Sequence, residues 1–403
     1  MLNKQSVYKR NIVKHLYFNN ELCCGDLSEL TQKSIPLTTK VISELVDENI
    51  VIETGFANST GGRRPLMYSL KSGQMHVVAV SMDQFITKIS TIGINNKTVG
   101  EVTKVYIPLA NNPDALSQLT THIYNHIESS GIAKEKIIGI GIGMPGFVDV
   151  AKGINHSFLK TKKGSTIVGE IEAVVDIPVL IDNDSSLIAL AEYRFGAARG
   201  KQNAMVINVG WGVGLGMILK GELFRGYNGF AGEFSHIPLF SNNKICSCGK
   251  MGCLETETSL LVIVEKAVKA LQQGKISILK NISVDDIEAA SEKIMDAAIN
   301  GDKFSVELLS EAGYNIGRGV AILIHLLNPE LIVLSGRGSM AGKLWLTPIQ
   351  QAINEHCIPK IAQDTEVKIS SLGYQAELVG AAALVMEHYD ELDLIKNRIT
   401  EVA

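Results

Sequence analysis

The residues best suited to chemistry are one histidine and three cysteines in the middle of the chain. His236 is followed by Cys246, Cys248 and Cys253, so half of the six cysteines fall within eight residues. One imidazole and three thiolates complete a tetrahedral ligand set for Zn²⁺, and two glycines in the segment permit a tight turn. The alternative is a loop of free, reduced thiols. Because four protein ligands leave no open coordination position, the predicted zinc is structural and not hydrolytic.

A second group of polar residues stands where α/β proteins contact ligands. Asn183 and Asp184 follow the predicted strand Val179–Asp182 and precede a predicted helix. The Asp184 carboxylate could accept hydrogen bonds from a hydroxyl-rich ligand or take a proton from one, whereas in the competing interpretation it only caps the helix. Glu233 and Glu255 flank the predicted zinc segment. These side chains are candidate ligand contacts.

Glycine-rich turns recur at the ends of predicted strands. They lie at 139–146, 210–216 and 335–338. Glycine allows a backbone to approach a ligand closely, although such turns also occur for packing reasons. Three of them together favour a ligand cleft.

The elements that position these residues belong to a globular chain of several domains. Its 403 residues are 46% apolar and 20% charged, a composition that excludes disordered, collagen-like and coiled-coil chains. The polar N-terminus shows no signal-peptide pattern and the cysteines do not describe a secreted disulfide framework, so we expect a cytoplasmic protein. The uncharged run 202–219 contains four glycines and is interpreted as a buried strand and turn, with no membrane partner.

Residues 1–72 are predicted to form a winged helix-turn-helix. Apolar residues recur at helical spacing, Asp26 is placed to cap a short second helix, and two β-rich runs follow a third helix. Three helices followed by a two-stranded ribbon are typical of this DNA-binding fold. The predicted helices are Ser6–Phe18, Leu27–Gln32 and Pro36–Asn49, and the predicted strands are Ile50–Thr54 and Leu66–Leu70.

The outward face of the third helix and the tip of the wing are predicted to meet DNA. Leu37, Val41 and Leu45 are expected to bury the other face of this helix. Hydroxyl and ammonium groups can contact base edges and phosphates, and paired guanidinium groups suit phosphates or a narrow minor groove. The alternative is a solvated amphipathic helix and an ordinary hairpin. The predicted DNA contacts are Thr38, Thr39, Lys40, Ser43, Arg63 and Arg64.

From residue 73 to 403 strands and helices alternate, which predicts an α/β domain of two lobes with a cleft between them. The predicted strands are 76–81, 136–143, 179–182, 204–209 and 331–334, and the main helices are 114–129, 186–195, 259–272 and 303–327. The zinc segment, 236–253, forms a knuckle within this domain.

Several of these segments resemble the ROK family of sugar kinases and sugar-responsive repressors. The resemblance covers essentially the whole chain, and its motifs are 141–146, Asn183-Asp184, 210–216, 231–236 and the cysteine segment 246–255. It implies a bilobal, actin-like and sugar-kinase-like ATPase fold behind the winged helix. It further implies that sugar hydroxyls contact Asn183, Asp184, Glu233, His236 and Glu255, and that His236 and the three cysteines hold zinc. Where the family usually has glycine before that histidine, this chain has Ser235.

The departures from the kinase pattern favour the repressor branch. ROK kinases begin the large domain with an Asp-x-Gly-Gly-Thr-Lys loop around the ATP phosphates, and the matching stretch here, Asp83–Lys88, has lost both glycines. Phe85 and Ile86 take their places, and Trp211 replaces the usual threonine in the second phosphate loop. We therefore expect weak or absent ATP binding.

The leading hypothesis is a noncatalytic repressor, a homodimer or higher homo-oligomer that binds a palindromic operator and responds to a sugar or sugar phosphate. The alternative is a ROK sugar kinase in which Asp184 acts as the base toward a hydroxyl that attacks the ATP γ-phosphate. A third hypothesis, a sugar-binding scaffold without DNA activity, leaves the polar third helix and the arginine pair unexplained.

Overall fold

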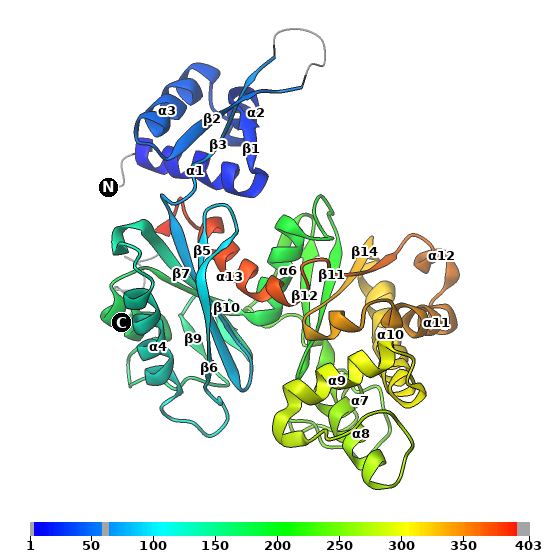
Figure 1. The fold of residues 1–403 in the computed structure, drawn as a ribbon. Coiled ribbons are helices and arrows are strands. Elements are labelled where there is room, and N and C mark those ends of the chain that lie inside the picture. Colours follow the sequence, from blue (N-terminus) through cyan, green and yellow to red (C-terminus); the bar gives the residue numbers. More distant parts are fainter. Residues whose placement is uncertain (1–3, 59–63, 393–403) are drawn as a thin grey trace. The chain divides into compact units, whose positions relative to one another are not determined.

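In a computed structural model the protein forms two compact units. The first unit comprises residues 1–184 and 378–403, and the second comprises residues 185–377. The structure describes residues 4–58 and 64–392 (Figure 1). The chain thus passes from one unit to the other at two places, one immediately after Asp184 and one near the start of the last helix.

A winged helix-turn-helix begins the first unit, as predicted. Its helices are α1 (Lys4–Asn19), α2 (Cys24–Thr31) and α3 (Ile35–Asp47). The wing strands β2 (Val51–Phe56) and β3 (Leu66–Leu70) pair antiparallel, and a third strand that the sequence pattern did not indicate, β1 (Glu21–Cys23), pairs with the other edge of β3. Ile12, Leu16 and Leu45 are almost fully buried and form the centre of this small core.

The third helix is turned differently from the prediction. Thr38, expected to point outward, is fully buried, and its hydroxyl lies 2.6 Å from the Tyr8 hydroxyl and donates to the Ser34 carbonyl at 3.0 Å. Leu37, expected in the buried stripe, is 42% exposed. The prediction failed because a polar side chain with two hydrogen-bond partners can be buried, and spacing alone does not reveal those partners. Thr38 is therefore removed from the predicted DNA contacts.

The cap of the second helix also differs from the prediction. Cys23 is the N-cap, and its sulfur accepts the backbone N–H of Asp26 at 3.4 Å. Asp26 lies at the third helical position, where its carboxylate accepts the Cys23 amide at 3.0 Å. The two residues form a reciprocal capping box, so Asp26 closes the box from inside the helix.

A five-stranded sheet follows the winged helix in the first unit. Its spatial order is β10-β7-β4-β5-β6, with β10, β7 and β4 parallel and β5 antiparallel to both its neighbours. Apolar residues of α4 and α5 pack with those of the strands into one core. The elements are β4 (His76–Met82), β5 (Ile86–Gly93), β6 (Thr98–Tyr106), α4 (Ala115–Ser129), β7 (Ile137–Met144), the small pair β8 (Val148–Asp149) and β9 (Ile154–Asn155), α5 (Ile167–Val175) and β10 (Val179–Asn183).

The second unit repeats this sheet topology. Read from the opposite end, its order is β15-β14-β11-β12-β13, again three parallel strands followed by two that alternate in direction. The two sheets confirm the predicted pair of α/β lobes. The strands are β11 (Ala204–Val209), β12 (Val213–Leu219), β13 (Glu222–Phe224), β14 (Leu331–Ser335) and β15 (Glu366–Ile369).

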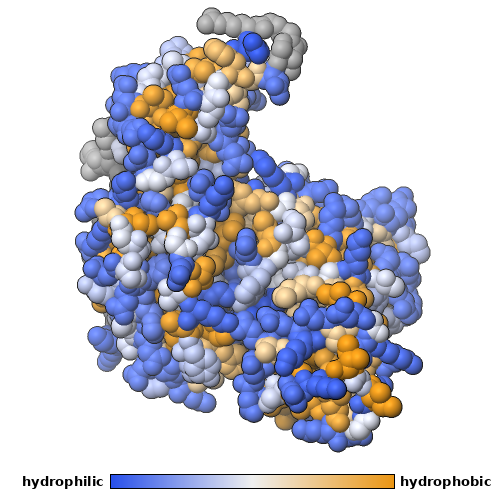
Figure 2. Space-filling model, in the orientation of Figure 1, coloured by the Kyte–Doolittle hydropathy of each residue, from blue (hydrophilic) through white to orange (hydrophobic). Residues whose placement is uncertain are grey.

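The helices around the second sheet lie mostly between β13 and β15 in the sequence. They are α6 (Asp184–Phe195), α7 (Glu255–Thr258), α8 (Leu260–Gln272), α9 (Ile287–Ile299), α10 (Lys303–Leu327), α11 (Leu346–His356) and α12 (Pro359–Ala362). Short 3₁₀ turns occur at 134–136, 234–236, 284–286, 337–345 and 373–375. Among the described residues no helix is long and apolar enough to cross a membrane, and the face in Figure 2 mixes hydrophilic and hydrophobic residues without a continuous apolar band.

The last helix, α13 (Ala376–Glu387), packs directly on β7 of the first unit. A Cβ atom added to Gly141 would lie 1.9 Å from the Ala381 carbonyl oxygen, and one added to Gly139 would lie 2.7 Å from the Val385 side chain. These two glycines, part of a stretch predicted as a ligand turn, lie inside a strand and allow the helix to approach the sheet.

We predict that Gly141→Ala destabilises the first unit by about 1–3 kcal/mol, because the added methyl group has no space between β7 and α13. Urea unfolding of the purified protein measures this effect. Gly25→Ala is the control, since its new methyl group would meet only Cys23 Sγ at 3.5 Å and α2 should keep or gain stability. Equal stability of the two variants would contradict the prediction.

Candidate functional site

The four predicted metal ligands meet in the second unit. The Nδ1 atom of His236 lies 3.4 Å from Cys246 Sγ, and the Sγ atoms of Cys248 and Cys253 lie 3.6 Å apart. All four donor atoms lie within 4.8 Å of one another. A tetrahedral ion with bonds of about 2.0–2.3 Å separates its ligand atoms by about 3.3–3.8 Å. The donor set and its spacing therefore fit one metal ion.

The local backbone explains why these ligands converge. Two short bridges, Pro238 with Cys253 and Ile245 with Met251, fold the segment back on itself. Gly252 has a φ of +75°, and its carbonyl accepts the amides of Leu239 and Phe240 at 2.9 and 3.0 Å. A side chain at Gly252 would begin 2.0 Å from the Phe240 carbonyl oxygen, so only glycine suits this position.

The thiols of the cluster differ in acidity. Burial, with contributions from the neighbouring thiols of Cys246 and Cys248, raises the pKa of Cys253 to about 12. At Cys248 burial acts in the same direction, but hydrogen bonds, first among them one from the Lys250 backbone, lower its pKa overall. Since metal ligation requires thiolates, a bound ion must displace protons from this cluster, and its affinity depends on pH.

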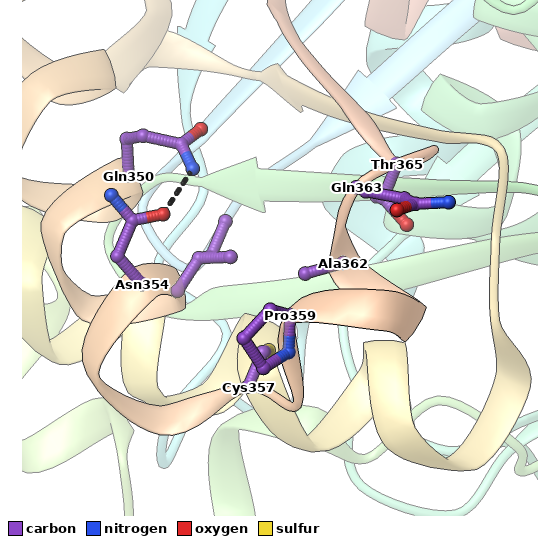
Figure 3. A pocket seen from close by; sticks show the side chains of 8 residues that line it. Gln350, Asn354, Cys357, Pro359, Ala362, Gln363 and Thr365 are labelled. Atoms are coloured by element: carbon purple, nitrogen blue, oxygen red, sulfur yellow. Dashed lines mark hydrogen bonds between the residues drawn. The ribbon is translucent and has the colours of Figure 1, made fainter.

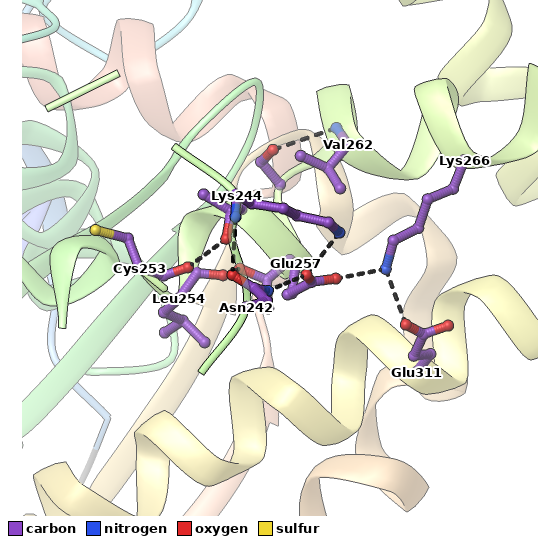
Figure 4. A network of polar contacts seen from close by, with 11 residues as sticks. Asn242, Lys244, Cys253, Leu254, Glu257, Val262, Lys266 and Glu311 are labelled. Carbon is purple, nitrogen blue, oxygen red and sulfur yellow. Dashed lines mark hydrogen bonds and ion pairs between the residues drawn. The ribbon is translucent and has the colours of Figure 1, made fainter. Parts of the chain in front are cut away.

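A buried carboxylate anchors the metal segment to the neighbouring helices. Glu257 in α7 accepts hydrogen bonds from Asn242 at 2.7 Å and Lys244 at 2.6 Å on one side and from Lys266 of α8 at 2.8 Å on the other. Lys266 also reaches Glu311 of α10 at 2.8 Å (Figure 4). The lysines lower the pKa of Glu257 although burial opposes them. Sequence inspection missed this network, whose hydrogen-bonded partners lie 9 to 45 positions apart in the chain.

Two carboxylates border the metal cluster, as the sequence order indicated. The Nε2 atom of His236 lies 3.6 Å from Glu233 Oε2, while Nδ1 faces the cysteines. Glu255 Oε2 accepts the Val213 amide at 3.3 Å, and its Oε1 lies 3.4 Å from Ser247 Oγ. A metal ion on Nδ1 would leave the proton of His236 on Nε2, aimed at Glu233 or at a ligand hydroxyl. One imidazole can therefore serve both the metal and a ligand.

Glu233 is electrostatically unlike an ordinary surface glutamate. Its side chain is 45% exposed, yet the protein around it removes enough water to raise its pKa, an effect that the nearby Glu255 reinforces and His236 opposes. A carboxyl group with a raised pKa gives up its proton less readily than a free one does.

The remaining predicted sugar contacts, Asn183 and Asp184, lie in the first unit, at the end of β10. Asn183 ends β10, where its side-chain amide donates to the Gly146 carbonyl at 3.2 Å. Asp184 is the first residue of α6, so it occupies the first turn and is not the preceding cap. The five predicted contacts thus form two groups, Asn183 with Asp184 and Glu233 with His236 and Glu255. That one sugar contacts both groups stays a prediction.

The loop that corresponds to the kinase phosphate loop is a closed hairpin turn. Asp83 Oδ1 accepts the backbone amides of Phe85 at 2.8 Å and Ile86 at 2.7 Å. Met82 pairs with Thr87 across the turn between β4 and β5. The amides that would have to face a phosphate are therefore hydrogen-bonded to the chain's own carboxylate.

A cavity of about 400 Å³ lies elsewhere in the second unit, around α11 and α12 (Figure 3). Gln350 and Asn354 are joined there by a 3.0 Å hydrogen bond, and the buried Cys357 also lines it. None of the predicted site residues borders this cavity. It offers amides, a hydroxyl and a thiol but no carboxylate or imidazole.

The predicted DNA contacts on the described residues differ in exposure. Thr39, Lys40 and Ser43 are exposed on α3, and Arg64 is exposed beside the wing. Arg63 lies outside the described residues. With Thr38 buried, three side chains of the third helix remain available to a partner.

A winged helix joined to two repeated α/β sheets, with a Cys3His cluster beside two carboxylates, defines a DNA-binding module fused to an actin-like fold. A model of the ROK family matches residues 81–388, and the chain belongs to this family. The resemblance seen in the sequence is thereby confirmed. Since the family match begins at residue 81, the winged helix lies outside it.

Known members of the family include both enzymes and regulators. The chain is 33% identical to a glucokinase of Halalkalibacterium halodurans over 73% of this chain and 92% of that protein. It is 27% identical to a xylose repressor of Caldicellulosiruptor bescii over 95% of this chain and 96% of the repressor. A solved ROK family transcriptional regulator, a homologue of the Escherichia coli MLC protein, matches with 26% identity and a TM-score of 0.77, covering 98% and 99% of the two chains.

We predict that the purified protein carries about one metal ion per chain and that Cys248→Ser lowers this content, because the variant loses one of four ligands. Elemental analysis measures it. The apparent affinity should also rise with pH between about 6 and 8, since thiol protons must leave before the metal binds. Competition with a chromophoric chelator measures this trend.

Cys24→Ser is the matched control, because Cys24 is a thiol of α2 outside the cluster. It should leave the metal content unchanged. A Cys248→Ser protein with full metal content, or an affinity independent of pH, would contradict the assignment of the ligands.

Proposed function

We propose that this protein is a sugar-responsive transcriptional repressor. The observation that carries the proposal is the winged helix joined to a ROK domain, because the matches to the xylose repressor and to the MLC homologue extend over at least 95% of the chain. The match to the glucokinase covers 73% of it. A DNA partner is consistent with the cytoplasmic location expected from the sequence.

The DNA contacts that we propose are Thr39, Lys40 and Ser43 on α3 and Arg63 with Arg64 on the wing. A third helix with exposed hydroxyl and ammonium groups suits a major groove, and wing arginines suit phosphates or a narrow minor groove. A homodimer would present two such modules to a palindromic operator, because the two-fold symmetry of the protein then matches that of the DNA.

The effector that we propose is a sugar or sugar phosphate held by Asn183, Asp184, Glu233, His236 and Glu255. Carboxylates, an amide and an imidazole are the groups that hydrogen-bond to hydroxyls. We propose Zn²⁺ as the ion of the cluster, since three thiolates and one imidazole within 4.8 Å of one another suit it. The ion would hold His236 and Glu255 in position and take no part in chemistry.

A kinase is the second candidate, because a glucokinase is 33% identical and Asp184 is retained. In that mechanism Asp184 would accept the proton of the attacking sugar hydroxyl. The hydrogen bonds from Phe85 and Ile86 to Asp83 favour the regulator, because they engage the amides of the two residues that replace the glycines of the phosphate loop.

We predict that the double variant Arg63→Ala, Arg64→Ala binds the operator more weakly and with a flatter salt dependence, each lost phosphate contact lowering the logarithmic slope by about 0.9. Ser43→Ala should instead change the preferred base sequence. Fluorescence anisotropy at several salt concentrations measures both effects.

Lys152→Ala with Lys303→Ala is the control, because it removes the same charge from exposed positions outside the winged helix. Its affinity should match that of the wild type. If the arginine variant kept the wild-type salt slope, the wing would not touch DNA.

We predict that Asp184→Asn weakens sugar binding about tenfold or more, because hydrogen bonds to a charged acceptor contribute roughly 1.5–3 kcal/mol each. The variant should still bind its operator and should need more sugar for release. Calorimetry with a panel of monosaccharides, amino sugars and their phosphates, followed by operator release, measures both.

Asp176→Asn is the control, since Asp176 is an exposed C-cap of α5. Neither the wild type nor Asp184→Asn should transfer phosphate from ATP to the sugar. Phosphorylation by the wild type that disappears in Asp184→Asn would replace the repressor-only function with the kinase.

A further inference from the structure

Arg337 lies at the carboxyl end of β14 in the sheet of the second unit. β11 and β14 are adjacent and parallel, and the next strands lie on opposite sides of them, β12 beside β11 and β15 beside β14. At such a switch point of an α/β sheet, ligands bind beyond the carboxyl ends of the two strands. The turns at this place are Gly210–Gly212 and Gly336–Gly338.

Both turns are built for close approach. Gly336 has a φ of +76°, and a Cβ there would lie 2.1 Å from Asn208 Oδ1, while a Cβ on Gly338 would lie 2.7 Å from the Val209 side chain. The turn after β14 therefore lies directly against the end of β11. Arg337 stands between these two glycines.

The guanidinium group of Arg337 lies between two aromatic rings. Its Cζ atom is 4.7 Å from the centroid of Trp211 and 4.4 Å from that of Tyr374. Its Nη1 donates to Glu288 Oε1 of α9 at 2.6 Å. Arg337 is 6% exposed and Trp211 is 5% exposed. We call these four side chains the strand-end stack.

The strand-end stack has the form of a bound planar ligand. A guanidinium group is flat and delocalised and stacks on aromatic faces much as a heteroaromatic ring does. Two aromatic walls bind a nucleobase through its faces, and a carboxylate at the edge can accept from an exocyclic amine. Here the chain itself supplies the planar group.

We propose that Arg337 occupies the place of a purine nucleoside or nucleotide and thereby excludes such ligands from the second unit. The inference rests on the proposed function, in which the repressor responds to a sugar and needs no nucleotide. It differs from the loss of the phosphate loop, because it concerns another sheet and other residues.

The test uses the chain's two tryptophans, both of which touch this place. Trp211 belongs to the strand-end stack, and the Trp345 indole N–H donates to the Gly338 carbonyl at 2.7 Å. Intrinsic fluorescence and the melting temperature are followed while adenosine or methylguanidinium is added to the wild type and to Arg337→Ala. Arg318→Ala is the control, because Arg318 stacks on Phe240 at 4.9 Å elsewhere in the same unit.

Arg337→Ala should bind both probes, with adenosine bound about tenfold or more tightly than by the wild type. The wild type and Arg318→Ala should show no response up to millimolar concentrations. Glu288→Gln is a more conservative second variant, which keeps the size of the side chain but removes the negative charge that pairs with Arg337. It should bind adenosine more weakly than Arg337→Ala does.

Two results would overturn the proposal. One is adenosine binding by the wild type as tight as by the variants; the other is a folded Arg337→Ala or Glu288→Gln protein that binds neither probe. Sugar-dependent operator release is measured on the same proteins without nucleotide. If the wild type showed no sugar-dependent release, the repressor function would be rejected. The adenosine result would not be affected by that outcome.

Discussion

The convergence of four ligand side chains on one point is the constraint on which the candidate ligand site depends. His236 comes from a short 3₁₀ turn, and the cysteines come from a loop that folds back through two isolated bridges. An ion on this set would fix the orientation of the His236 ring and hence the direction of its second nitrogen toward Glu233. The same loop leads into α7, where Glu255 reaches the Val213 amide and Glu257 binds two lysines. The geometry of a bound ion and that of the candidate ligand contacts Glu233 and Glu255 would therefore be coupled.

At two strand ends, groups that could bind a ligand are contacted by side chains of the chain itself. In the first unit the Asp83 carboxylate accepts the amides of the turn between β4 and β5. In the second unit Arg337 lies between Trp211 and Tyr374 and pairs with Glu288. Backbone amides and aromatic faces are the groups that hold nucleotides in other α/β proteins, and here an internal carboxylate and an internal cation take them. Such an arrangement suits a protein that has kept the sugar-kinase architecture for recognition.

Much of the fold followed from local sequence signals. The strands Ala204–Val209 and Leu66–Leu70 and the helix Lys303–Leu327 have the predicted bounds, because their apolar periods are long and their ends carry glycine, proline or capping residues. The strands β5 and β6 were missed, since their alternation is weaker and polar residues such as Lys88 and Thr91 are buried in β5. A pattern of apolar spacing does not identify polar residues that find partners inside the protein.

The sequence by itself determined the Cys3His cluster, the winged helix and the membership of the ROK family, because each depends on residue types at short, fixed spacing. Only the tertiary structure decided that Thr38 faces Tyr8, that Gly141 admits α13, and that Arg337 stacks between Trp211 and Tyr374. These contacts join residues that lie 30 to 240 positions apart in the chain. Their energies arise from close packing, burial and hydrogen-bond partners, which come into being only when distant segments fold against one another.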